Sequence, residues 1–361
     1  MSNTLQTPVN DSRSPAGAGG THRDTTPSRW HRPLMGAGYA FTALALVSVV
    51  GLFVDDRAIL GENVWIKPLK FGFAFAAYCF SLAWLLGHLT RLRRFGWWTG
   101  TVFAAISVLE VGAIAAAAAA GTFSHFNTTE GGLNDLVQAA FQLIPLMMTV
   151  NLVIAVMVLF QKFGDRAVTA VVRWGLFLST LGMVAAFGIV TAGGQGERVQ
   201  TDANGDEVLL NAGHGVGDLD GGGMFLTGWS TTGGDMRVPH FIGLHGIQVL
   251  IIAAFAMSAL AVRHAWLCDD RTRARIVHSL ALGTLGLFAT TSMQALRGQS
   301  FVHPDAVTLA GFSASAAITI AGIAWAAAVA KAEARKESGT ESGLESGDAE
   351  PVLTGFANTP R

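Results

Sequence analysis

Apolar residues along the chain gather into eight long runs that are separated by short polar segments. Each run is about 20 residues long, the length that an α-helix needs to cross the hydrocarbon of a bilayer. Because backbone polar groups in lipid must be satisfied within their own segment, we predict that the runs are helices. They cover residues 34–54, 71–89, 97–120, 137–160, 170–192, 238–262, 277–296 and 306–330. The expected fold is an all-α, polytopic bundle of about eight transmembrane helices.

The basic residues predict the orientation of this bundle. If the N-terminus is cytoplasmic, the outer side holds only six of the 24 Lys and Arg residues, namely Arg57, Lys67, Lys70, Arg198, Arg237 and Arg297. The others then lie in the two tails and the inner loops, in agreement with the positive-inside bias. We therefore expect both termini to be cytoplasmic.

The polar segments divide the chain into regions. Residues 1–33 are rich in Ser, Thr, Pro and Gly and lack the apolar core of a cleavable signal peptide, so we expect a disordered cytoplasmic tail. The transmembrane domain covers 34–331, with one long outer loop at 193–237. We expect the apolar end of that loop, 224–229, to pack as a lid over an outer cavity. Residues 332–361 are acidic and of low complexity, and a second disordered cytoplasmic tail is expected there.

Composition narrows the class of protein further. The chain is 51% hydrophobic and 14% charged, whereas an average soluble domain carries about 25% charged residues. A net charge of −1, without a basic and aromatic stripe, indicates no nucleic-acid partner, so the expected partner is the lipid bilayer. Cys79 and Cys268 should lie at different depths and form no disulfide. No Gly-rich phosphate loop, serine-hydrolase elbow or zinc-ligand spacing is present, so no enzyme class is assigned.

Four cations at predicted outer helix ends run against the orientation bias: Lys67, Lys70, Arg237 and Arg297. The first three lie at helix N-termini, where the helix dipole also favours an anion. They could bind the phosphate of a lipid or polyprenyl chain, or the propionates of a haem. Alternatively, they extend to lipid headgroups or pair with nearby aspartates.

Five histidines also fall on the predicted outer side: His125, His214, His240, His245 and His303. His240 and His245 are about 140° apart around a regular helix, so one metal could use both only if the helix start is unwound. We expect His245 to converge with at least one of His240, His303 or His125, in a site for haem or a transition metal. Gln248, on the same helix face, could orient the His245 ring. Alternatively, these are interfacial histidines with ordinary hydrogen bonds.

Glu110 lies near the middle of the third predicted helix, where a charged carboxylate costs roughly 2.5–3.5 kcal/mol on insertion scales. It should therefore face the bundle, and it is the candidate for acid/base catalysis. Pro145 is expected to kink the fourth helix, and counting around a regular helix turns Asn151 away from Gln142. A buried polar network that sets helix register is the alternative.

Several outer phrases resemble a family of uncharacterised bacterial multi-pass membrane proteins. The resemblance rests on an aspartate pair before a Trp-x-Lys-Pro segment, a Gly-Asp-x-Arg-x-Pro-His-Phe-x-Gly-Leu-His segment and an Arg-Gly-Gln loop. The matching residues are Asp55, Asp56, Trp65, Lys67, Pro68, Gly234, Asp235, Arg237, Pro239, His240, Phe241, Gly243, Leu244, His245, Arg297, Gly298 and Gln299. The resemblance implies a shared fold and a place in the bacterial cytoplasmic (inner) membrane, but no activity.

Together these features predict a polar, histidine-containing cavity open to the extracytoplasmic side. Three classes of function fit it: a haem- or metal-binding redox protein, a membrane enzyme acting on an anionic lipid or isoprenoid, and a transporter. The inner halves of the helices are almost uniformly apolar, which disfavours transport.

Overall fold

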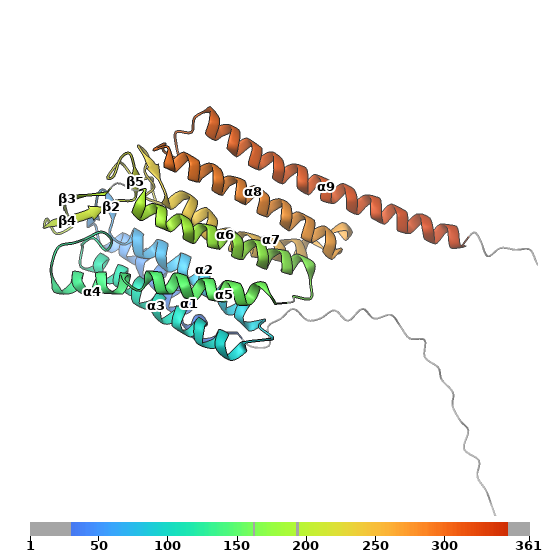
Figure 1. Cartoon of the computed structure of the whole chain (residues 1–361), viewed down its shortest axis with the longest axis horizontal. Helices are drawn as coiled ribbons and strands as arrows, with labels where there is room; N and C mark the ends of the chain where they lie inside the picture. Colours follow the sequence, from blue (N-terminus) through green and yellow to red (C-terminus); the bar gives the residue numbers. More distant parts are fainter. Residues whose placement is uncertain (1–29, 162, 193–194, 346–361) are drawn as a thin grey trace, which may run out of the picture.

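Residues 30–161, 163–192 and 195–345 are described in the computed structural model of the protein. Within these residues, eight helical spans are long and apolar enough to cross a membrane, which confirms the predicted fold class. The helices are α1 (Arg32–Val54), α2 (Ile66–Gly87), α3 (Arg93–Ala119), α4 (Gly132–Phe141), α5 (Ile144–Leu159), α6 (Arg166–Thr191), α7 (Arg237–Leu260), α8 (Asp270–Leu296) and α9 (Ala306–Glu345), with a 3-10 turn, η1 (Ala265–Leu267). They run side by side along one axis (Figure 1).

Three small antiparallel sheets lie at one end of the bundle, which we name the loop end (Figure 1). They pair β1 (Ala58–Ile59) with β2 (Glu62–Asn63), β3 (Gln195–Thr201) with β4 (Glu207–Ala212), and β5 (Gly215–Val216) with β6 (Gly234–Asp235). We name the opposite end, where α3, α6 and α8 begin, the arginine end. Two of these sheets lie in the predicted long loop, where the paired strands satisfy one another's backbone groups.

The fourth span departs from the single helix predicted over 137–160. It begins earlier and consists of two helices, α4 and α5, joined by Gln142 and Leu143. Pro145 lies in the first turn of α5, where its missing N–H needs no partner. In a continuous helix its ring would clash with the carbonyl of Phe141, so the chain breaks there.

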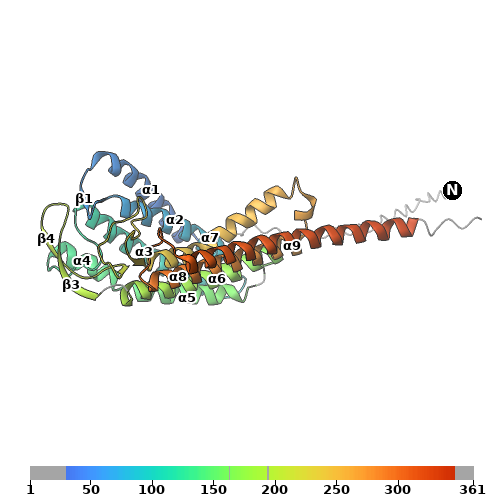
Figure 2. The same cartoon turned by 90° about the horizontal axis from the view of Figure 1, so that it is seen from above.

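The last helix is longer than predicted. The apolar run ends near residue 330, yet α9 continues to Glu345 and extends past the other helices (Figure 2). The boundary placed at 332 therefore falls inside a helix. Its continuation is rich in Ala, Glu, Lys and Arg, which favour helix, and Glu333 pairs with Arg275 of α8. Residues 1–29 and 346–361, predicted to be disordered, lie outside the described residues.

Close helix packing positions the start of α7. Gly182 of α6 faces Gly243 of α7, and a Cβ added at Gly243 would lie 2.6 Å from the Gly182 Cα. Small residues at such a contact let two backbones approach closely in lipid. At this contact His240 Nδ1 lies 2.8 Å from the Gly182 carbonyl oxygen. The glycine pair thus holds one of the predicted site residues against α6.

The direction of insertion is a prediction that fusion reporters can check. We expect reporters fused at Arg94, Arg166, Arg273 and the C-terminus to show a cytoplasmic location, because the basic loops should stay inside. Fusions at Glu130 and Asp220 should report the outer side. A single loop on the wrong side would contradict either the helix count or the orientation.

Candidate functional site

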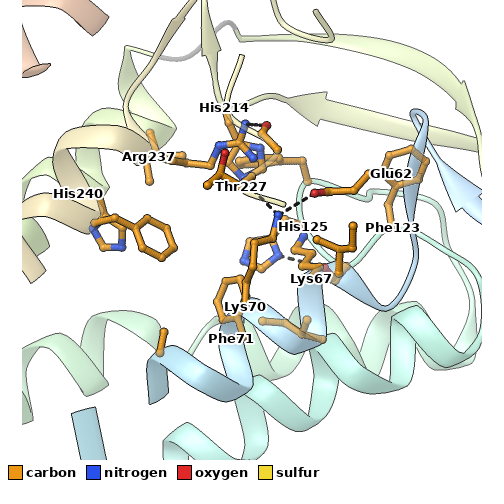
Figure 3. A pocket seen from close by; sticks show the side chains of 18 of the residues that line it. Glu62, Lys67, Lys70, Phe71, Phe123, His125, His214, Thr227, Arg237 and His240 are labelled. Carbon is orange, nitrogen blue, oxygen red and sulfur yellow. Dashed lines mark hydrogen bonds and ion pairs between the residues drawn. The ribbon is translucent and has the colours of Figure 1, made fainter. Parts of the chain in front are cut away.

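A cavity of about 810 Å³ lies at the loop end, among α2, α3, α5, α6 and α7 and the loops that cover them. Its volume is within the range of small-molecule sites, about 300–1,000 Å³. Seven of the ten predicted site residues line it: Lys67, Lys70, Glu110, His125, Arg237, His240 and His245. Figure 3 shows how Lys67, Lys70, His125, His214 and Arg237 gather at one part of its wall.

The loop before α2 is held by one aspartate. The Asp55 carboxylate accepts from the Arg57 guanidinium at 2.8 and 3.0 Å and from the Trp65 indole N–H at 2.8 Å. Asn63 Nδ2 donates to the Asp55 carbonyl. These bonds fix the β1–β2 turn against the end of α1, and so place Lys67 at the second position of α2.

A similar Asp-x-Arg clamp precedes α7. The Asp235 carboxylate is fully buried and accepts from the Arg237 guanidinium, at 2.6 Å from Nη2, and from the Arg237 and Ser230 backbone N–H groups. Arg237 Nη2 also donates to the Gly228 carbonyl at 2.6 Å. A charged pair that is fully hydrogen-bonded in this way anchors the end of the long loop to the helix start.

The four cations that line the cavity differ in their partners. Lys70 pairs with Glu62 at 2.9 Å, Arg198 with Asp220 at 2.6 Å, and Arg237 with Asp235. The Lys67 ammonium makes no hydrogen bond or ion pair with any residue that the structure describes, and the residue is half-buried at the cavity wall. A half-buried cation without a partner gains from an anion placed beside it. Lys67 is therefore the cation available to a ligand.

Residues from 224 to 228 lie along the cavity, where the lid was predicted. Lys70 Nζ donates to the Thr227 carbonyl at 3.0 Å, and Trp229 packs against the rings of Phe241 and Phe301. Phe225 does not pack as expected, since 92% of it is exposed. The segment is held by its own backbone hydrogen bonds and by Lys70 and Arg237, which bond its carbonyls. Whether it closes over a ligand stays a prediction.

Four histidines line the cavity: His125, His214, His240 and His245. The rings of His125 and His214 are 6.3 Å apart, and the His245 ring is 5.6 Å from Phe241. His214 had not been singled out as a ligand, because nothing in the sequence around it shows that its loop folds back onto His125. His245 lines the same cavity as His125 and His240. That these rings coordinate one metal ion stays a prediction.

His125 and His214 lie outside the membrane-spanning helices and in a positive environment. Burial lowers the pKa of each ring well below the ordinary 6.5, and the charges of Lys67 and Arg237 lower both pKa values further. Both rings are therefore neutral at pH 7. A neutral imidazole offers one N–H donor and one nitrogen acceptor, so the pair can bond an anion without carrying charge.

These lowered pKa values predict a pH-dependent stability. The unfolded chain has ordinary histidine pKa values, so below about pH 6.5 it binds more protons than the folded protein. Stability should then fall as the pH drops from about 7 to about 5, measured as the thermal unfolding midpoint in detergent. His125→Gln or His214→Gln should flatten this dependence, whereas His303→Gln, at an exposed ring, should not. Equal slopes in all three variants would contradict the assignment.

Glu110 lies at the deep part of the cavity. It is nine residues before the end of α3, about 14 Å along the helix at 1.5 Å per residue. It is 5% exposed, and its Oε1 atom has no hydrogen-bond partner among the described residues. Glu110 thus faces the bundle as predicted and presents a carboxyl group far from the cationic wall.

A second polar group near this depth was missed. The Tyr78 hydroxyl donates to Asn151 Oδ1 at 2.9 Å and lies 3.1 Å from Ser179 Oγ. Tyr78 and Asn151 both line the cavity, while Gln142 is exposed. Asn151 and Gln142 do face different ways, as counting around a helix predicted, but Asn151 is the one that lines the cavity.

Three predicted site residues lie outside the cavity lining. Arg297 pairs with Asp305 at the start of α9, and the exposed His303 ring lies 3.2 Å from the Thr231 carbonyl. Gln248 is next to His245, but no described residue is in hydrogen-bonding geometry with either of its buried amide atoms. Arg297 and His303 lie away from the cavity because α8 and α9 pack on the side of α7 opposite α2 and α3.

Few of the described side chains are placed to bind a metal ion together. Among the described residues, no group of three or more His, Cys, Asp or Glu side chains is arranged to hold a metal ion. Cys79 is buried and Cys268 exposed, and both are free, as predicted. The comparisons with protein-family models, curated proteins and solved structures found no match to this chain. The family resemblance of the loop motifs thus stays an expectation, and the site is interpreted from its own geometry.

Proposed function

We propose that this integral membrane protein binds an anionic amphiphile, a phosphate-bearing lipid or isoprenoid, in the cavity at the loop end. The observation that carries the proposal is the Lys67 ammonium, which lines the cavity without a partner among the described residues, while Lys70, Arg198 and Arg237 each have a carboxylate. A phosphate at Lys67 could also accept from His125 or His214. The loop end would face the outside of a bacterial cytoplasmic membrane.

The rest of the cavity suits an apolar chain. Below the cations its wall is made of aromatic and aliphatic side chains, among them Phe71, Phe75, Phe103, Ile114 and Met147. Burial of a chain there contributes about 0.8 kcal/mol per CH₂ group. The cationic end orients the ligand, and the apolar part provides most of the binding free energy.

If the protein is an enzyme, this arrangement favours acid/base groups other than Glu110, the candidate that the sequence indicated. Glu110 is too deep to reach a phosphate held at Lys67, and it would contact the far part of the chain. His125 and His214, neutral and beside the cations, are the better candidates for proton transfer at the head group. Transport, the third class considered, has no specific contact that supports it.

A matched pair of ligands tests the proposal. Delipidated protein in detergent is titrated with a polyprenyl phosphate and with the polyprenyl alcohol of the same chain length. We expect the phosphate to bind at least about tenfold more tightly, because only it compensates the Lys67 charge. Equal affinity for the alcohol would show that the cavity recognises the chain alone and would contradict the proposal.

One contact favours a second function, a haem protein. His240 Nδ1 donates to the Gly182 carbonyl at 2.8 Å, which leaves Nε2 as the nitrogen available to a metal. Imidazole ligands are commonly oriented by such a bond to a carbonyl. Haem propionates could then face Lys67. Visible absorption and iron content of the purified protein test this alternative, and a colourless, iron-free protein that resists haem reconstitution would rule it out.

A further inference from the structure

A second hollow, of about 730 Å³, lies between α6 and α8 at the arginine end of the bundle. We name it the arginine groove and define it by Arg166, Arg173, Trp174, Phe177, Arg271 and His278. It shares no lining residue with the cavity at the loop end. Inferences about the two sites are therefore independent.

Three guanidinium groups in the arginine groove have no anionic partner. The side chains of Arg166, Arg173 and Arg271 make no hydrogen bond or ion pair with the part of the chain that the structure describes. All three residues are exposed. Arg275, which also lines the groove, is already paired with Glu333.

The acidic residues nearby are engaged elsewhere. Asp165 pairs with Arg273 at 3.1 Å and caps α6 through the Val168 N–H. Asp270 accepts from the first two backbone N–H groups of α6 at 2.7 and 2.9 Å, and Asp269 caps α8. The carboxylates that the structure describes thus leave the charges of Arg166, Arg173 and Arg271 without a partner.

The positions of the groove residues match the shape of a phospholipid. Arg166 and Arg271 lie at the first turns of α6 and α8, and Arg173 lies about 10 Å further along α6 at 1.5 Å per residue. Phe177, one turn deeper and 47% exposed, continues the same face. An exposed arginine two turns into a span is costly in lipid unless an anion accompanies it.

A polar contact at the same level adds to this match. The Trp174 indole N–H donates to His278 Nδ1 at 2.7 Å across the groove. This bond leaves His278 Nε2 as the nitrogen that carries the proton and can donate. Tryptophan is also typical of the membrane interface, where headgroups lie.

We propose that the arginine groove binds the headgroup of an anionic phospholipid, with the phosphate at Arg166, Arg173 and Arg271 and an acyl chain along Phe177. Basic pockets between transmembrane helices recognise such headgroups. The lipid belongs to the leaflet at the arginine end and would connect α6 to α8.

Native mass spectrometry of the full-length protein tests this site. Delipidated protein is titrated with phosphatidylglycerol and with phosphatidylcholine of the same acyl chains. The test variant is Arg166→Gln/Arg173→Gln/Arg271→Gln, and the control Arg91→Gln/Arg93→Gln/Arg94→Gln removes the same charge from the end of the loop after α2 and the first turn of α3. We expect the test variant to lose at least about tenfold in phosphatidylglycerol affinity and the control less than about twofold.

Other outcomes would overturn the proposal. Equal losses in both triple variants would indicate a general charge effect, and equal binding of both lipids would exclude headgroup recognition. Displacement of the lipid by inorganic phosphate at matched concentration would indicate a site for free anions. If the triple variant does not fold, Arg173→Gln alone is expected to lower affinity roughly threefold, and no change in that variant would contradict the site.

Discussion

Lys67→Met is expected to weaken binding of a polyprenyl phosphate by roughly 10- to 100-fold, because a hydrogen bond to a charged group contributes about 1.5–3 kcal/mol. Methionine keeps an unbranched side chain that is one atom shorter and lacks the ammonium group. Since Lys67 lines the cavity and has no partner within the described residues, the protein should keep its fold. Isothermal calorimetry in detergent measures the effect.

Two control variants sharpen this experiment. Lys67→Arg should restore most of the affinity, since it retains the positive charge. Arg297→Gln removes a cation from the same end of the bundle but outside the cavity lining, and it should leave the affinity unchanged. If Lys67→Met binds the phosphate as the unmodified protein does, Lys67 is not the ligand cation.

Asp235→Asn is expected to destabilise the protein by about 3–5 kcal/mol, the cost of leaving a buried charge without its partner. The Asp235 carboxylate is fully buried and accepts every one of its bonds from Arg237 and Ser230. An amide nitrogen in its place would face donors, and the Arg237 charge would stay uncompensated. The unfolding midpoint in detergent should fall by several degrees.

Asp305→Asn is the matched control for this loss of charge. Asp305 pairs with Arg297, but 35% of its side chain is exposed and it caps α9 through the Thr308 N–H. Asparagine caps a helix about as well as aspartate, and an exposed ion pair contributes little. The midpoint should therefore change much less than in Asp235→Asn. Equal shifts would mean that burial does not decide the cost of these two pairs.

The two experiments answer different questions. Lys67 carries the proposed ligand contact and has no partner in the part of the chain that the structure describes, whereas Asp235 is paired with Arg237 and does not line the cavity. Lost binding with an unchanged midpoint in the first variant would support the ligand site. A lowered midpoint with retained binding in the second would show that the clamp before α7 is structural.

The sequence by itself predicted the eight spans and their approximate ends. The reason is physical: bilayer thickness sets the length of an apolar helix, and an apolar run of that length can be recognised directly in the sequence. Pro145 also indicated where the fourth span is interrupted, because a proline ring in a helix clashes with the carbonyl four residues earlier. Prediction was weaker for the polar segments, where β3 and β4 form a hairpin that depends on pairing between strands.

Only the tertiary structure decided which polar residues form a site. Lys67 in α2, His125 between α3 and α4, and Arg237 in α7 meet because the helices pack around one cavity. The tertiary structure also decided how these cations are paired. Lys70, Arg237 and Arg297 pair with nearby acidic residues, which was the alternative to ligand binding, whereas Lys67 pairs with no described residue. Helix periodicity follows from the local chain, but the distance between side chains on different helices depends on packing, which no local pattern encodes.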